Sequence, residues 1–204
     1  IPATAVNGLI TAGLRESDKF APATLSEYLG LPLNYGEVVD LGGGLPRQQA
    51  AAVNDILATL DDLGRVGEGL ELALEGLALG TFDVSWPLLL HLALARRARG
   101  DTEGARADLQ KLLSGTPSVT TRAYGLALLA ELSEDAHEAE AAVAAGLALT
   151  SATELLEARV ITSVAAARFG SQQQRTAALD MLSALDLDSL PAHLTPRVQD
   201  ALAT

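Results

Sequence analysis

The sequence predicts an all-α protein, and three observations lead to that fold class. From about Arg47 onward, leucine and alanine recur at intervals of three and four residues, which is the spacing that lines one face of an α-helix. No stretch after residue 47 alternates apolar and polar side chains as a half-buried strand would. Glycine, proline and serine fall between the apolar runs, where they would end one helix and separate it from the next.

The first 46 residues are predicted to form a separate N-terminal part. Residues 3–15 have a helical pattern, whereas residues 17–46 are expected to be mostly irregular. Gly42, Gly43 and Gly44 precede the helix that starts near Arg47, so their N–H groups could hold an anion at its N-terminus. The alternative is that these three glycines form a hinge, which is the commoner role of such a run.

The helical body is predicted to run over residues 47–185, followed by a C-terminal capping helix within residues 186–204. In chain order, its helices are expected at about residues 47–63, 70–77, 86–98, 103–114, 119–132, 135–149, 152–168 and 172–185. The last short helix should begin at Thr195-Pro196, since threonine is a good N-cap and proline is tolerated at the first helical position.

Two capping boxes support these boundaries. Ser151 and Glu154 have the required spacing, and so do Ser171 and Gln174. In this motif each side chain satisfies a backbone N–H group of the other residue. We therefore expect both serines to precede the first turn of a helix.

Small residues indicate an internal repeat. Gly69, Ala105, Ala139 and Ala177, each placed in the second helix of a predicted pair, are spaced by 36, 34 and 38 residues. Twelve residues before these positions come Leu57, Ala93, Ala127 and Ala165. Two antiparallel helices joined by a short turn pack closely where their facing side chains are small. The alignment therefore predicts close contact within each pair.

One stretch, Leu92-Ala-Leu-Ala-Arg-Arg-Ala-Arg-Gly-Asp-Thr-Glu-Gly-Ala-Arg-Ala-Asp-Leu109, resembles the tetratricopeptide repeat family. It has a small residue in the first helix, a Gly-Asp turn and an early alanine in the second helix, and Pro117 follows at the end of the unit. Leu63–Leu70 is a weaker copy, and residues 47–185 carry the resemblance. The family's characteristic Trp and Tyr are missing from most units, and the spacing departs from about 34 residues. The resemblance implies a tetratricopeptide-like right-handed α-solenoid of about four antiparallel helix pairs.

The resemblance also implies a function. Such repeats are non-enzymatic scaffolds whose first helices line a concave groove for a peptide or a partner helix. Transferred to this sequence by position, the groove residues are Asn54, Asp61, Leu90, Leu94, Arg97, Thr121, Tyr124, Leu128, Glu131, Arg159 and Thr162.

Three of these residues have a particular chemical reason to bind a partner, and each has an alternative role. Tyr124 offers contact area and a hydroxyl group, or it belongs to the core with its hydroxyl at the rim. Arg97 and Arg159 could grip a carboxylate through two hydrogen bonds. Alternatively, Arg97 complements a helix C-terminus, and Arg159 pairs with Glu154 or Glu157 on its own helix.

Composition excludes several function classes. The chain of 204 residues has 14 basic and 26 acidic residues and a net charge of −12, which disfavours nucleic acid and anionic membranes. No apolar run reaches the ~18 residues that span a bilayer. Cysteine is absent and the three histidines are far apart, so we expect no metal site. No nucleophile elbow or phosphate-binding loop occurs, so we expect neither catalysis nor a cofactor.

Two other functions stay open at this stage. The chain could be an assembly subunit of a larger bacterial complex, docked through its N-terminal segment or its solenoid ends. An enzyme of unrecognised type or a sensor is also compatible with the sequence. The bias of 12 Arg over 2 Lys favours a bacterial source. The non-Met start and the absence of cysteine favour an exported protein over a cytoplasmic one.

Overall fold

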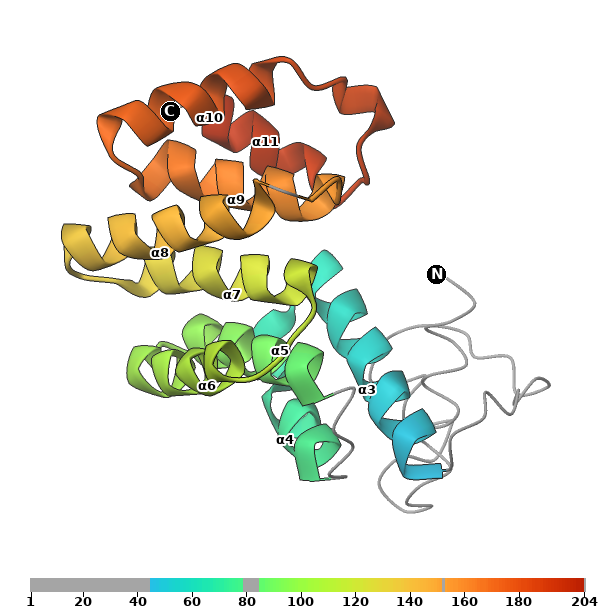
Figure 1. The fold of residues 1–204 in the computed structure, drawn as a ribbon. Helices are drawn as coiled ribbons and strands as arrows, with labels where there is room; N and C mark the ends of the chain where they lie inside the picture. The colour runs from blue at the N-terminus through green and yellow to red at the C-terminus, as the bar shows by residue number, and fades with distance from the viewer. Residues whose placement is uncertain (1–44, 79–84, 152, 204) are drawn as a thin grey trace. The chain divides into compact units, whose positions relative to one another are not determined.

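The computed structural model describes residues 45–78, 85–151 and 153–203. Within these ranges the elements are helices and no strand occurs (Figure 1), which confirms the predicted all-α class. The chain divides into two compact units, Ile1–Asp101 (unit 1) and Thr102–Thr204 (unit 2). The predictions for residues 3–15, for most of residues 17–46 and for Gly42–Gly44 lie outside the described residues. The solenoid arrangement and the number of repeats stay predictions.

Unit 1 contains three α-helices and one short 3₁₀ helix among its described residues. They are α3 (Leu45–Asp62), η1 (Val66–Gly69), α4 (Leu70–Ala78) and α5 (Ser85–Ala98), and they pack on one another. Helix α3 starts two residues before the predicted Arg47. The buried core of the unit is aliphatic and consists of Ala50, Val53, Ile56, Leu57, Leu60, Ala73, Leu88 and Leu92.

Two glycines end helices in unit 1. Gly64 follows α3 with φ of +68°, and Gly100 follows α5 with φ of +81°. The N–H groups of Arg65 and Asp101 donate back to the carbonyls of Leu60 and Arg96, in the arrangement of a Schellman motif. Glycine suits both positions because it has no Cβ to oppose the left-handed conformation.

The first pair of the repeat alignment lies in close contact. A Cβ added to Gly69 would collide with the side chain of Leu57 and would meet Leu60 Cδ1 at 3.4 Å. Any larger residue at this position would therefore require the Leu57 side chain to shift. This is the contact that the twelve-residue offset between Leu57 and Gly69 predicts.

Unit 2 is a stack of helices connected mostly by short turns. Its elements are α6 (Thr102–Ser114), α7 (Val119–Leu132), α8 (Ala136–Thr150), α9 (Leu156–Phe169), α10 (Gln172–Ser183), η2 (Leu187–Ser189) and α11 (Thr195–Leu202). Helix α7 packs on α6, α8 and α9, whereas α9 packs on α7, α8, α10 and α11. Helix α9 is therefore the central element of the unit.

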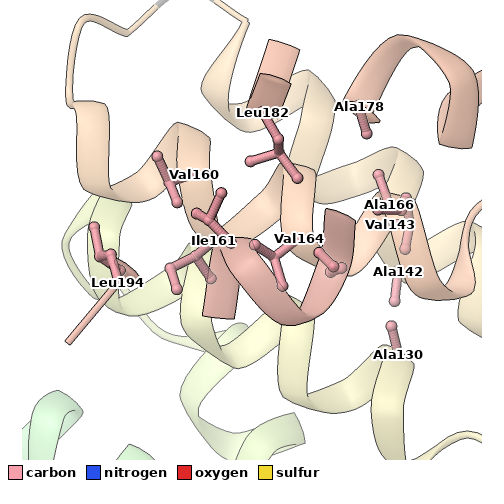
Figure 2. Close-up of a cluster of buried hydrophobic side chains, with 14 of the residues drawn as sticks. Ala130, Ala142, Val143, Val160, Ile161, Val164, Ala166, Ala178, Leu182 and Leu194 are labelled. Atoms are coloured by element: carbon pink, nitrogen blue, oxygen red, sulfur yellow. The ribbon is translucent and has the colours of Figure 1, made fainter. Parts of the chain in front are cut away.

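Helix α9 is buried on nearly every side. Each residue from Val160 to Ala167 is buried, because this stretch of mostly small and apolar side chains packs against several helices. Figure 2 shows Val160, Ile161 and Val164 among side chains from the neighbouring helices, including Val143 and Leu182. The largest core of the described chain thus forms around α9.

One of the two predicted capping boxes is wrong. Helix α9 begins at Leu156 and not near residue 152, and its N-cap Leu155 has no side-chain cap. The Ser151 hydroxyl instead donates to the carbonyl of Ala148 at 2.9 Å, because α8 continues to Thr150 and uses Ser151 as its C-cap. Thr195 also fails as a cap: the N-cap of α11 is Leu194, and it makes no side-chain cap hydrogen bond.

The second capping box forms as predicted. The N–H group of Ser171 donates to Gln174 Oε1 at 2.8 Å, and the N–H group of Gln174 donates to Ser171 Oγ at 3.4 Å. We expect Ser171→Ala to lower the free energy of unfolding by about 1 kcal/mol, because one cap of α10 is lost. Hydrogen exchange of peptides from α10 measures this change in unit 2 itself. Ser151→Ala is the matched control and should cost less than about 0.5 kcal/mol; equal losses in both variants would contradict the capping role.

A partly exposed ion pair connects α6 to α8 in unit 2. The Arg106 guanidinium donates to both carboxylate oxygens of Glu138, at 2.6 and 2.9 Å, and to the carbonyl of Leu132. These hydrogen bonds hold the pKa of Glu138 below its usual value. Because solvent screens exposed pairs, we assign this one to fixing the position of α6 rather than to a large share of stability.

Candidate functional site

Unit 2 has a cleft of about 560 Å³ where the end of α8 and the following connection meet α9 and α10. Its size lies in the range of about 300–1,000 Å³ that is typical of ligand sites. Polar and apolar side chains line it in about equal measure. The lining residues are Leu147, Thr150, Ser151, Thr153, Glu154, Arg159, Ser163, Gln174, Ala177, Ala178 and Met181.

Helix α9 supplies two hydrogen-bond donors to the cleft. Arg159 and Ser163 are four residues apart, so they lie on the same face of the helix, and both line the cleft. Arg159 is exposed and forms no ion pair with any residue that the structure describes. Ser163 is only 5% exposed, and its hydroxyl has no hydrogen-bond partner among the described residues. Because Ser163 lines the cleft, its hydroxyl can donate to a bound ligand.

Helix α10 supplies a third donor. Gln174 uses its Oε1 atom to accept the N–H group of Ser171 in the capping box. The same hydrogen bond fixes the orientation of the amide group, so that Nε2 is left as a donor. The Gln174 side chain makes no further hydrogen bond with the described part of the chain. The cap of α10 therefore positions a donor at the cleft.

The connection between α8 and α9 adds a negative charge and an apolar pair of residues. Glu154 lines the cleft and is exposed, without an ion pair to any residue of the described ranges. Leu155 and Leu156 follow directly and are 49% and 41% exposed. Two adjacent leucines exposed to this extent beside a polar cleft are suited to contact with another chain.

A second polar group lies at the contact of α7, α9 and α11. The Tyr124 hydroxyl donates to Glu157 Oε1 at 2.9 Å, and His193 Nε2 lies 3.3 Å from the same oxygen. The Arg197 guanidinium carbon is 5.9 Å from the centre of the Tyr124 ring, within the range of a cation–π contact. Because these side chains already contact one another, we interpret the group as a tether that holds α11 on α9.

Comparisons with known proteins give no relative. No protein-family model, curated protein or solved structure matches the chain. The tetratricopeptide resemblance therefore gains no support from these comparisons and stays a prediction. Among the described residues, no group of three or more His, Asp or Glu side chains could hold a metal ion. In the same part of the chain, every helix is too short or too polar to cross a bilayer.

In unit 2, the predicted groove residues lie in different environments: some are exposed, and others are buried in the core. Arg159 lines the cleft, and Glu131 is exposed. Thr121 supports the N-terminus of α7, where its N–H and hydroxyl groups contact Ser118.

Two of the predicted groove residues, Leu128 and Thr162, are buried. The Thr162 hydroxyl lies 3.0 Å from the hydroxyl of Thr150. Their side chains are occupied inside the core, so we do not retain these two as contact residues. Tyr124 packs against the core with its hydroxyl bonded to Glu157.

In unit 1, the predicted groove residues belong to α3 and α5. Asn54, Asp61, Leu94 and Arg97 are partly exposed, whereas Leu90 is 8% exposed and buried. The burial of Leu90 disfavours direct contact with a partner. Arg97 lies in the last turn of α5, where a cation also complements the helix dipole.

The sequence reasoning missed Ser163, Gln174 and Glu154 as cleft residues. Ser163 could have been found from its spacing of four residues from Arg159. Gln174 was assigned to a cap and nothing else. Ala177 was expected in a close helix contact, but it is exposed and lines the cleft. Its small side chain leaves space between α9 and α10 that a leucine would fill.

Proposed function

We propose that the chain is a non-enzymatic, tetratricopeptide-like interaction scaffold that binds a short peptide segment of a partner protein in the cleft of unit 2. The observation that carries the proposal is the set of donors of Arg159, Ser163 and Gln174, which are left without partners among the described residues. An acidic group of a peptide would bind the Arg159 guanidinium, which can grip a carboxylate through two hydrogen bonds. Leu155 and Leu156 would pack against the neighbouring part of the peptide.

The size of the cleft favours a short extended segment over a partner helix. A helix about 10 Å across fills roughly 80 Å³ per Å of length. The cleft of about 560 Å³ would therefore hold little more than one helical turn. An extended segment needs less width, and its side chains alternate between two faces, so that some enter the cleft and others contact its rim.

The overall charge of the chain favours partner proteins with a surplus of basic residues. The net charge of −12 produces a field that attracts basic proteins and raises their association rate. We therefore propose a partner segment with an acidic residue for Arg159, within a protein surface that carries a surplus of basic residues. Association should then slow as salt is added, since salt screens long-range attraction.

Selection from a random peptide library tests the proposal. Peptides selected on the whole chain are measured by fluorescence anisotropy against the unmodified protein and the Arg159→Ala variant. We expect the dissociation constant to rise by about 10-fold or more in the variant, because a hydrogen-bonded charge pair is lost. Arg175→Ala is the matched control: Arg175 is exposed on α10 but does not line the cleft. Failure to select any peptide, or equal affinity for all three proteins, would overturn the proposal.

A further inference from the structure

The cleft has two opposite charges that do not neutralise each other. Glu154 and Arg159 both line it and both are exposed, but they make no ion pair within 4 Å of each other or of any other described residue. In an exposed site, water solvates such charges separately, and the attraction between them is modest. Both charged groups are therefore available to a ligand.

Neither charge suits a ligand of one sign only. A purely anionic ligand would bind Arg159 but would be repelled by Glu154, and a purely cationic ligand would have the opposite difficulty. Like charges placed close together across an interface disfavour binding and select against the wrong partner. The pair therefore selects for a ligand that carries both signs.

The uncharged side chains give the cleft a direction. Ser163 lies four residues after Arg159 on α9 and lines the cleft with it, so its hydroxyl adds a donor beside the guanidinium, and donors stabilise an anion. Glu154 lies on the connection from α8, beside Thr153, whose hydroxyl oxygen already accepts the N–H group of Leu155 at 3.2 Å. The anionic group of a ligand belongs at α9, and its cationic group belongs at the connection.

We infer that the cleft recognises a mixed-charge ligand, with a carboxylate bound by Arg159 and Ser163 and an ammonium or guanidinium bound by Glu154. This inference rests on the proposed function for the source of the charges, which are an acidic and a basic side chain a few residues apart in one peptide. The same chemistry occurs in a free zwitterion such as a dipeptide, so the test includes both sources.

Charge reversal on both sides of the complex tests the inference. The probes are peptides with one glutamate and one lysine separated by one to three residues, in both orders, together with glycylglycine as a free zwitterion. The proteins are the unmodified chain, Glu154→Arg, Arg159→Glu and the double variant. We expect each single reversal to raise the dissociation constant of the preferred peptide by about 10-fold or more. The double variant should bind the peptide of reversed order within about 3-fold of the original affinity.

The possible outcomes separate this inference from the proposed function. If peptides bind but neither reversal changes their affinity, or the double variant fails to recover binding of the reversed order, the charge inference is wrong and the scaffold stands. If glycylglycine binds with the same charge dependence and the peptides do not, the charge inference stands and the peptide scaffold is wrong. If nothing binds, both are wrong. Circular dichroism of each variant establishes that the exposed substitutions leave the fold intact.

Discussion

Replacing Leu182 with alanine is expected to lower the free energy of unfolding of unit 2 by about 2–5 kcal/mol. Leu182 on α10 is fully buried and belongs to the core around α9 (Figure 2). The substitution removes the transfer free energy of the lost methyl and methylene groups, and it leaves a cavity that the surrounding helices fill only in part. Since proteins of this size are stable by only about 5–15 kcal/mol, the loss is a large fraction of the total.

The measurement has to report on unit 2 itself. Because the chain divides into two units, a global unfolding curve need not describe one two-state transition. Hydrogen exchange of peptides from α9 and α10 measures the local opening free energy directly. Leu202→Ala is the control: Leu202 ends α11 and is 38% exposed, so its replacement should cost less than about 1 kcal/mol. If Leu182→Ala lowers the local opening free energy by no more than Leu202→Ala does, the result would contradict the central place of α10 in the core.

The sequence predicted the helices well because their signals are local. Periodic leucine and alanine identified every described α-helix except α11, which was predicted from Thr195-Pro196, and Ser171 with Gln174 marked the start of α10. Ser151 and Glu154 have the same spacing but form no box. The difference is set by tertiary structure, because α8 runs on to Thr150, where the hydroxyls of Thr150 and Thr162 meet inside the core. A spacing of three residues carries no information about that contact.

The candidate site was predictable only in part, for a related reason. Arg159 follows from its residue type and its place on a helix. Whether Ser163 has a hydrogen-bond partner depends on which helix packs over it, and no sequence pattern encodes that. The cleft itself exists because Ala177 and Ala178 are small where α10 faces α9. Sequence reasoning expected small residues to bring helices together, and it had no means to tell a close contact from an opening.

The second large effect is a loss of stability in unit 1 at acidic pH. We expect it to arise from protonation of His91. This residue lies on α5, and its Nδ1 atom is buried without a hydrogen-bond partner among the described residues. Burial lowers the pKa of His91 from 6.5 to about 4, and the Asp61 carboxylate opposes this shift only in part. His91 is therefore neutral in the folded unit at pH 7.

The direction of the pH effect follows from the difference in the pKa of His91 between the folded and unfolded states. Below pH 6.5 the unfolded chain binds a proton at His91, whereas the folded unit does so only below about pH 4. Stability is therefore complete above pH 6.5 and is lost as the pH falls toward 4. Between pH 7 and pH 5 the loss should be about 2 kcal/mol. Burial raises the pKa of Asp55 on α3, so that group acts in the opposite direction and at lower pH.

Trp86 makes this prediction measurable in unit 1 alone. It is the single tryptophan of the chain and lies on α5, five residues before His91, so its fluorescence reports on the helix that contains the titrating group. Urea unfolding followed by this signal at pH 7, 6 and 5 should show the loss in the unmodified protein and a flat profile in His91→Gln. His137→Gln, which removes an exposed histidine of α8, should keep the loss. A slope that persists in His91→Gln would assign the acid sensitivity to other groups and would contradict a buried, neutral His91.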